Sequence, residues 1–307
     1  MAEKAKTGAK RWMTLTAFAI IYLVWGSTFL AIRVGVAEVP PLLFAAMRFL
    51  VAGAVLVAWT VARGERLPTR RQWLSVVLLG MLIFLIDYGL LFWAEQRVPS
   101  GIAAVMLATI PVFMALAEIL FLRTQKLTAR LALALVVGLL GVVVLTLRSV
   151  AGLGDSALDG LGATALIVSA ISWAVASSLT RRLPLPESKV MSSGTQMLAG
   201  GLLLTIASAG FGEFHRFDPS AVSLKAWMAL LYLIVAGSII GFTAYVWLIH
   251  HQSPTKVGTY AYVNPVVAVV LGYFFGGEAL GIRAVLGTLC VLVSVVVITT
   301  SRKSEVA

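Results

Sequence analysis

Two charged residues lie more than five residues inside both ends of long apolar stretches of this sequence. Arg48 lies in the stretch 41–62 and Asp87 in the stretch 73–93. If both stretches are membrane-spanning helices, each charge lies about 10 Å below the same membrane surface, because a helix rises ~1.5 Å per residue. An unpaired charge at that depth costs at least ~2.5 kcal/mol. The positions predict either an ion pair between neighbouring helices or direct chemistry, with Arg48 binding a substrate carboxylate and Asp87 binding an ammonium group or a proton.

Two prolines lie near the middle of other apolar stretches. Pro111 falls in the stretch 100–122 and Pro265 in the stretch 255–276. A proline within a helix removes a hydrogen bond and favours a kink, so both positions are predicted helix breaks. Interrupted hydrophobic segments at matching places in two halves of a chain indicate the binding site of a transporter. Asn264, whose amide stands beside the freed carbonyl, is predicted to line that cavity.

Aromatic residues at mid-depth complete the candidate site. Two tryptophans, Trp25 and Trp173, lie far from the membrane surfaces where tryptophan usually gathers. Tyrosine hydroxyls within the layer require hydrogen-bond partners. The alternative for these aromatic residues is ordinary packing between helices. The predicted substrate cavity consists of Trp25, Tyr88, Trp173, Tyr245, Tyr260 and Asn264.

Composition indicates that membrane helices position these residues. The chain has 307 residues, of which 60% are hydrophobic and 12% charged, and its mean hydropathy is +0.98. Ten apolar stretches, each long enough to cross a ~30 Å hydrocarbon layer, are separated by short polar gaps. They are residues 12–31, 41–62, 73–93, 100–122, 127–147, 160–180, 190–210, 226–249, 255–276 and 280–300. The sequence therefore predicts an all-α integral membrane protein with ten transmembrane helices.

The net charge of +11 comes from basic residues in the gaps between these stretches. That pattern is typical of a membrane protein and argues against nucleic-acid binding. Because most Lys and Arg residues fall in gaps on the side of the N-terminus, both termini are predicted to be cytoplasmic in a multi-pass protein of the bacterial inner membrane. Cys290 is the single cysteine, so no disulfide or cysteine metal site is expected. No cofactor is expected either, and the expected partners are a small-molecule substrate and the lipid bilayer, with the protein a monomer or weak dimer.

The chain also shows internal repetition. A shift of 148 residues places Trp25 on Trp173, and a shift of 154 places Pro111 on Pro265. Because five helices are an odd number, a second five-helix unit must enter the membrane from the opposite side. This predicts inverted repeats related by a pseudo-two-fold axis in the membrane plane. The predicted units are residues 1–148, with helices 1 to 5, and residues 149–307, with helices 6 to 10, here called the first half and the second half.

Several of these features together resemble the drug/metabolite transporter superfamily, and within it the EamA-type ten-helix exporters. The resemblance covers nearly the whole chain and depends on the order of short motifs: Trp25-Gly26-Ser27-Thr28-Phe29, Arg48, Pro111, Asn264-Pro265 and Gly277-Glu278. Within that superfamily the chain is most similar to the YddG-like exporters of aromatic amino acids. Where many relatives carry Gly-Glu after the fourth helix, this chain has Arg123-Thr124-Gln125-Lys126, so the halves are not expected to be gated identically. Glu278 is expected to order the turn before the last helix.

The residues and the resemblance together predict a secondary transporter that exports amino acids with aromatic or other large neutral side chains by alternating access. A cavity with few charges and several rings suits a zwitterion with an apolar group. Proton-driven and passive transport both stay open. Other amphipathic metabolites, cationic drugs and nucleotide sugars are alternative substrates. A channel would need a filter sequence or a charged ring, and an enzyme would need a motif such as HExxH or GxSxG, none of which is visible.

Overall fold

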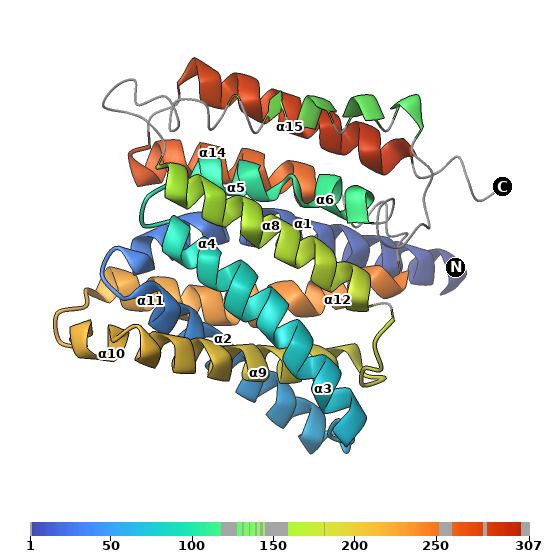
Figure 1. Cartoon of the computed structure of the whole chain (residues 1–307). Helices are drawn as coiled ribbons and strands as arrows, with labels where there is room; N and C mark the ends of the chain where they lie inside the picture. Colours follow the sequence, from blue (N-terminus) through green and yellow to red (C-terminus); the bar gives the residue numbers. More distant parts are fainter. Residues whose placement is uncertain are drawn as a thin grey trace.

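Every element in the described part of the chain is a helix, and the helices lie side by side in one bundle (Figure 1). The computed structural model describes residues 2–117, residues 128–144 apart from 131, 135, 139, 142 and 143, and residues 159–180, 182–251, 260–278 and 281–301. Helix α1 (Ala2–Val36) begins at the end of the bundle where α15 (Ile282–Ser301) finishes. The first described helix and the last described helix therefore have their outer termini at the same end of the bundle (Figure 1).

The first half supplies seven labelled helical segments. They are α1, α2 (Pro41–Ala62), α3 (Arg70–Leu79), the π-helix η1 (Gly80–Tyr88), α4 (Gly89–Ala94), α5 (Ser100–Leu107) and α6 (Ile110–Ala117), followed by helical residues between 129 and 144. Segments α3, η1 and α4 follow one another without interruption. The long third helix of this half is therefore α-helical at its ends and π-helical in its middle.

The second half has a similar order of segments, with one additional short helix. Its segments are α8 (Gly160–Thr180), α9 (Lys189–Gly210), the short α10 (Glu213–Arg216), α11 (Leu224–Tyr232), the π-helix η3 (Leu233–Ile240), α12 (Gly241–His251), α14 (Tyr260–Gly276) and α15. Segments α11, η3 and α12 again form one uninterrupted helix with a π-helical middle. A π-helical segment is frequently found at a functional site, and here one lies at a similar place in each half.

Six helices of the described chain are long and apolar enough to cross a membrane. They are Trp12–Val36, Pro41–Ala62, Arg70–Ala94, Gly160–Thr180, Lys189–Gly210 and Leu224–Tyr245. Shorter apolar helices cover Ser100–Met114, Val263–Gly276 and Val285–Ser294. These six agree with the predicted stretches one, two, three, six, seven and eight. Parts of the predicted fourth, fifth, ninth and tenth stretches lie outside the described residues, so the full count of ten stays a prediction.

Local sequence explains where several helices begin. Thr69 caps α3 in a reciprocal capping box with Gln72, in which each side chain bonds the other residue's backbone N–H. Ser188 caps α9 and Ser223 caps α11 by accepting a backbone N–H of the first turn. Gly64 follows α2 with a φ of 80°, a conformation that costs glycine little.

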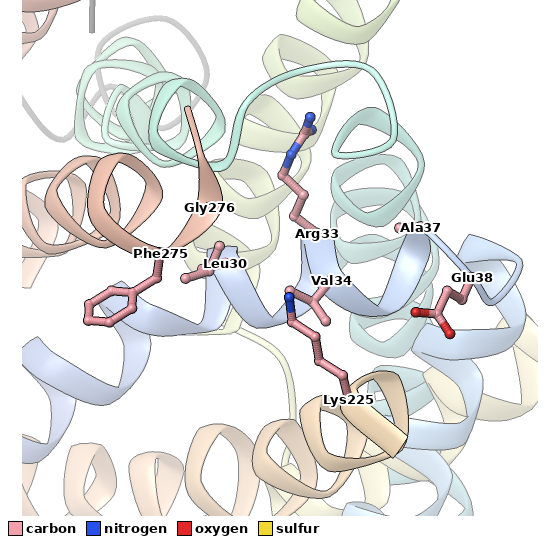
Figure 2. A pocket seen from close by; sticks show the side chains of 8 residues that line it. All are labelled: Leu30, Arg33, Val34, Ala37, Glu38, Lys225, Phe275 and Gly276. Carbon is pink, nitrogen blue, oxygen red and sulfur yellow. The ribbon is translucent and has the colours of Figure 1, made fainter. Parts of the chain in front are cut away.

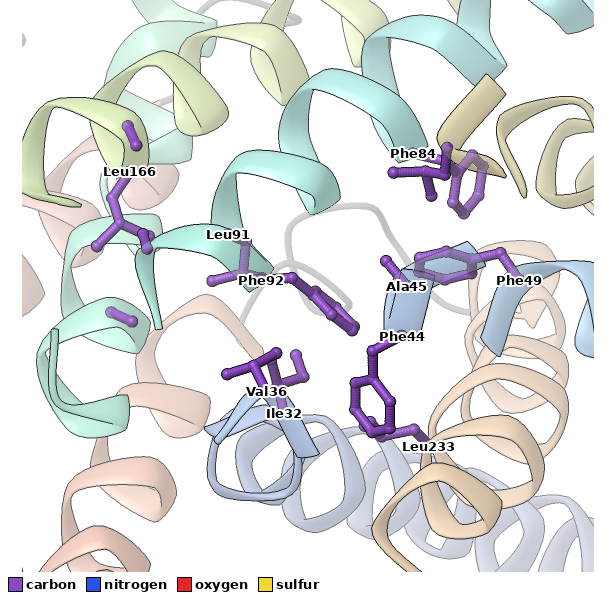
Figure 3. Close-up of a cluster of buried hydrophobic side chains, with 14 of the residues drawn as sticks. Ile32, Val36, Phe44, Ala45, Phe49, Phe84, Leu91, Phe92, Leu166 and Leu233 are labelled. Atoms are coloured by element: carbon purple, nitrogen blue, oxygen red, sulfur yellow. The ribbon is translucent and has the colours of Figure 1, made fainter. Parts of the chain in front are cut away.

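The core lies where helices of both halves meet. Figure 3 shows Ile32 of α1, Phe44 and Phe49 of α2 and Phe92 of α4 pointing toward one another. Leu166 of α8 and Leu233 of η3 bring the second half into the same cluster. Aromatic rings dominate its centre, with Phe49 and Phe84 4.7 Å apart between ring centroids.

Helices α2 and α9 pack closely because glycines face each other between them. A Cβ atom on Gly53 would lie 2.8 Å from both the Gly194 carbonyl oxygen and the Leu198 nitrogen, and one on Gly201 would lie 3.0 Å from the Leu50 nitrogen. Small residues at such contacts allow backbones to approach one another. Gly53 and Gly201 are 148 residues apart, so each half places a glycine at the same contact.

Gly53→Ala is expected to destabilise the protein by about 1–3 kcal/mol, because the added methyl group would overlap backbone atoms that cannot move away. The matched control is Gly210→Ala at the end of α9, where an added Cβ meets nothing within 4 Å. Thermal unfolding in detergent measures both. A Gly53→Ala protein as stable as Gly210→Ala would contradict the close contact.

The two predicted helix breaks differ in the structure. Residues 108 and 109 form a turn that separates α5 from α6, directly before Pro111. At Pro265 the prediction of a break is wrong, because α14 continues as a helix from Tyr260 to Gly276 with the proline inside it. A proline removes a single backbone hydrogen bond, and groups on neighbouring helices can compensate for that loss within a membrane.

Candidate functional site

The predicted aromatic residues form two clusters. In the first, the Trp25 ring of α1 lies 5.2 Å from the Tyr245 ring of α12 and 5.3 Å from the Tyr260 ring of α14, measured between centroids. In the second, the Trp173 ring of α8 lies 6.2 Å from the Tyr88 ring at the end of η1. All five side chains are half-buried. Each cluster therefore joins helices of both halves, and the sequence prediction of one shared cavity wall stays a prediction.

Each half also donates a side-chain hydrogen bond to the π-helical segment of the other half. The indole nitrogen of Trp25 donates to the carbonyl of Gly237 in η3 at 3.1 Å. The hydroxyl of Ser172 in α8 donates to the carbonyl of Leu82 in η1 at 2.7 Å. A π-helical turn disrupts the regular hydrogen-bond ladder and leaves carbonyls that need donors. These two contacts have matching positions in the two halves, since Ser172 precedes Trp173.

Arg48 is buried between the halves, with 3% of its surface exposed. Its Nε donates to the Ser238 hydroxyl of η3 at 2.9 Å. The guanidinium lies over the Phe49 ring at 4.8 Å and the Tyr88 ring at 5.4 Å, as a weakly hydrated planar cation can. Its Nη1 is buried and has no acceptor among the described residues. The second aromatic cluster thus contains a cation with an unused donor.

Asp87 is equally buried, at 3% exposure, and accepts a hydrogen bond from the Ser169 hydroxyl of α8 at 2.5 Å. The predicted ion pair between Arg48 and Asp87 is not formed. Among the described residues, the ion pairs are Arg33–Glu278 and Arg97–Asp159. The reason is that the two side chains point to different helices of the second half. Arg48 donates to the Ser238 hydroxyl of η3, and Asp87 accepts from the Ser169 hydroxyl of α8.

Asn264 is buried in α14 against α1, with 8% of its surface exposed. Its amide nitrogen is placed to donate to the carbonyls of Ile21, Tyr22 and Tyr260, at 3.2–3.3 Å. A Cβ atom on Gly26 would lie 3.2 Å from the Asn264 carbonyl oxygen, which shows how closely these two helices approach. These hydrogen bonds therefore hold α14 against α1. The predicted contact of Asn264 with a ligand stays a prediction.

One end of the bundle is joined by carboxylates that bridge the halves. This latched end carries residues 37–40, 95–99, 211–223 and 277–278, on the left in Figure 1. The Glu38 carboxylate accepts hydrogen bonds from the Ser223 nitrogen at 2.6 Å and hydroxyl at 2.7 Å. Glu213 accepts from the Leu43 nitrogen at 2.8 Å. Each carboxylate thus caps the start of a helix in the other half, where the helix dipole favours negative charge.

Among the described bridging carboxylates, Glu278 accepts the most hydrogen bonds at the latched end. It accepts from the Ser100 nitrogen at 2.7 Å, from the Ser100 hydroxyl at 2.6 Å and from the Gly101 nitrogen at 3.1 Å. It also lies 3.6 Å from the Arg33 Nε. From the sequence, Glu278 was expected only to order a turn. In the structure this residue also caps α5 across the junction of the halves. The bonds from Ser223 lower the pKa of Glu38, so this carboxylate favours the ionised form.

A hollow of 210 Å³ opens beside these bridges. Figure 2 shows it between α1, the start of α11 and the end of α14, with Leu30 and Phe275 on its apolar side. Arg33, Glu38 and Lys225 supply its charges. From the same place Arg33 turns inward and donates from Nη1 to the carbonyls of Glu95 and Val98, both at 2.8 Å.

Three residues of this arrangement escaped the sequence analysis. Ser169 and Ser238 gave no signal, because single serines are common in apolar helices. Glu95 stands in a short charged gap, Glu95-Gln96-Arg97, and resembled an ordinary loop residue. In the structure Glu95 is fully buried, at 0% exposure. Among the described residues, no group of three His, Cys, Asp or Glu side chains could hold a metal ion.

Comparison with known proteins gives one family and several relatives. The model of the EamA-like transporter family matches this chain twice, at residues 12–147 and 160–300. The uncharacterized inner membrane transporter YedA of Escherichia coli is 41% identical over 266 residues, which cover 86% of this chain and 83% of that protein. Protein PecM of Dickeya dadantii is 26% identical and covers 90% of this chain and 88% of its own. A solved crystal structure shares the fold with a TM-score of 0.62 at 24% identity, covering 96% of this chain and 99% of the other.

Proposed function

Because the chain belongs to the EamA-like transporter family, we propose that it exports amino acids with aromatic or other large neutral side chains by alternating access. Its six long apolar helices make it a multi-pass membrane protein. The family and the names of its relatives indicate a transporter and not an enzyme. By analogy with the inner membrane relative YedA, and from the distribution of Lys and Arg, we place it in a bacterial inner membrane with both termini cytoplasmic.

Two observations support the inverted repeat on which alternating access depends. The family model matches two successive segments of similar length. The π-helical segments η1 and η3 occupy corresponding places in the halves, and each accepts a hydrogen bond from the other half. Two inverted copies of one unit can exchange inward-open and outward-open arrangements. Under this proposal the latched end faces outward, and its carboxylate bridges support an arrangement that is closed on that side.

The observation that carries the substrate class is the buried Arg48. A guanidinium with one unused donor, placed over aromatic rings at the junction of the halves, suits the carboxylate of an amino acid. The buried Asp87 carboxylate is available for the ammonium group. The half-buried rings of Tyr88 and Trp173 offer a surface for an apolar side chain. Together these groups match a zwitterion with a large neutral side chain.

A second substrate class is favoured by Asp87 alone. A buried carboxylate beside aromatic rings also suits a lipophilic cation, with no role for Arg48. Cationic drugs and other amphipathic metabolites are therefore the alternative within transport. A channel lacks support, since no ring of charges or carbonyl filter is visible in the described helices.

Uptake into proteoliposomes tests the proposal. The purified full chain is reconstituted and offered labelled phenylalanine, tryptophan, leucine, glutamate, a cationic dye and a sugar phosphate, with protein-free liposomes as the control. Saturable uptake of the large neutral amino acids, with competition among them, is the expected result. Uptake of the dye without any amino acid would transfer the assignment to cationic drugs. Saturable uptake of glutamate or the sugar phosphate instead would overturn the neutral-substrate assignment.

A further inference from the structure

Glu95 differs from every other carboxylate at the latched end. It follows the membrane-spanning segment Arg70–Ala94 directly, and its side chain is fully buried. Neither carboxyl oxygen has a hydrogen-bond partner among the described residues. By contrast, Glu38, Glu213 and Glu278 each accept two or more hydrogen bonds. Among the described carboxyl groups of the latched end, Glu95 is therefore the one that has no hydrogen-bond donor to stabilise a negative charge.

The charged groups that face Glu95 come from three places. Arg33 of α1 donates to the Glu95 backbone carbonyl at 2.8 Å and so lies beside it. Glu278, which follows α14, and Arg48 of α2 also interact with it electrostatically. The two arginines favour an ionised Glu95, but Arg33 is engaged with Glu278 and two carbonyls, and Arg48 donates from Nε to Ser238 and has no acceptor at Nη1 among the described residues. Neither donates to the Glu95 carboxyl.

Burial is the largest influence on this carboxyl. It raises the pKa of Glu95 well above the usual value, Arg33 and Arg48 oppose the shift, and Glu278 adds to it. A buried carboxyl without donors avoids the desolvation cost of ionisation by keeping its proton. Burial without donors therefore favours the protonated form of Glu95 while the latched end is closed.

From this geometry we infer that Glu95 is a proton-binding site and that proton uptake there stabilises the closed latched end. The inference rests on the proposed alternating access, but not on the substrate class. When Glu278 leaves the start of α5, water reaches the gap between the halves and can solvate an ionised Glu95. The carboxyl O–H then breaks and the proton passes to water. Closure reverses the step, so one proton is bound for each closing of this end.

The sign of the pH effect follows from linkage. The pKa of Glu95 is higher in the closed state than in the hydrated open state, so low pH favours closure. As the pH rises through the closed-state pKa, the closed state loses its advantage. Between the open-state and closed-state pKa values, each pH unit is expected to change the ratio of closed to open protein about tenfold.

Distances between spin labels can follow this equilibrium without any substrate. In a Cys290→Ser background, Ala37→Cys and Ala221→Cys place labels on exposed positions of the two loops that Glu38 and Ser223 join. The expected result is a short distance at acidic pH, with a growing long-distance population as the pH rises. Glu95→Gln, which is neutral at every pH, is expected to keep the short distance throughout. Glu187→Gln, an exposed position in a loop outside the latched end, is the matched control and should follow the parent protein.

A pH-independent distance in the parent, or an unchanged pH response in Glu95→Gln, would overturn the inference. If Glu95→Gln fails to fold, infrared difference spectra of Asp87→Asn decide instead, because that background removes the buried carboxyl of Asp87, whose signal would otherwise overlap that of Glu95. A protonated carboxyl band at neutral pH is expected, and its absence contradicts the site. If no amino acid is transported while the distances still respond to pH through Glu95, the proposed substrate fails and the proton site stands.

Discussion

Replacing Arg48 with glutamine is expected to lower the transport of large neutral amino acids about 100-fold. A hydrogen bond between a charged donor and a carboxylate contributes about 1.5–3 kcal/mol, and glutamine removes both the charge and the unused Nη1 donor. The loss is expected in substrate affinity, because the guanidinium would hold the substrate without taking part in any bond-making step. Initial uptake rates over a range of substrate concentrations measure it.

The matched control is Arg63→Gln. Arg63 follows the same helix, but it is exposed and lies 4.9 Å from the Trp59 ring centroid at the bundle surface. This variant should transport at the parental rate. Arg48→Gln must also be shown to be folded, since its removal releases Ser238 within the core. A folded Arg48→Gln protein with the parental apparent affinity would exclude Arg48 from the substrate site.

Replacing Glu278 with alanine is expected to open the latched end. The closed state would lose an acceptor for three donors of Ser100 and Gly101 and the partner of Arg33. Leaving buried donors unsatisfied costs about 1–3 kcal/mol each, whereas water can solvate them in the open state. The closed population should therefore fall by at least about 100-fold relative to the open one. The spin-label pair at residues 37 and 221 reports this as a shift to the long distance.

Glu278→Gln tests the contribution of the negative charge separately from that of the side-chain shape. The amide keeps an oxygen that can accept from Ser100 but loses the charge that attracts Arg33, so an intermediate population is expected. Both variants should reduce the pH response that depends on Glu95, because an open end exposes that carboxyl at every pH. An unchanged short distance in Glu278→Ala would show that the latched end is held by packing and not by these polar bridges.

Much of the helix arrangement could be predicted from the sequence. The length and apolar content of the stretches identified six spans that the structure contains with nearly the same limits. The glycines of the α2–α9 contact and the mid-depth tryptophans were recognisable because the 148-residue shift superimposes them. These features depend on residue type and spacing, which a sequence records directly.

The partners of individual side chains were harder to predict. Arg48 and Asp87 lie buried in long apolar helices, but their predicted pairing was wrong, because depth along a helix does not determine the direction in which a side chain points around it. Pro265 was expected to break a helix that in fact continues. Glu95 was overlooked because its burial depends on how α1 and α2 pack around the end of α4. Each of these outcomes is decided by three-dimensional packing between distant segments.

The hydrogen bonds from Trp25 to Gly237 and from Ser172 to Leu82 limit how the two halves can move. Both acceptors are carbonyls of π-helical turns near the middle of the bilayer, where a bare carbonyl costs several kcal/mol. A motion that pulled the halves straight apart would uncover both at once. Tilting about these two contacts keeps them satisfied while the ends swing in opposite directions. We therefore expect the two halves to tilt about this pair of backbone carbonyls, so that one end of the bundle opens as the other closes.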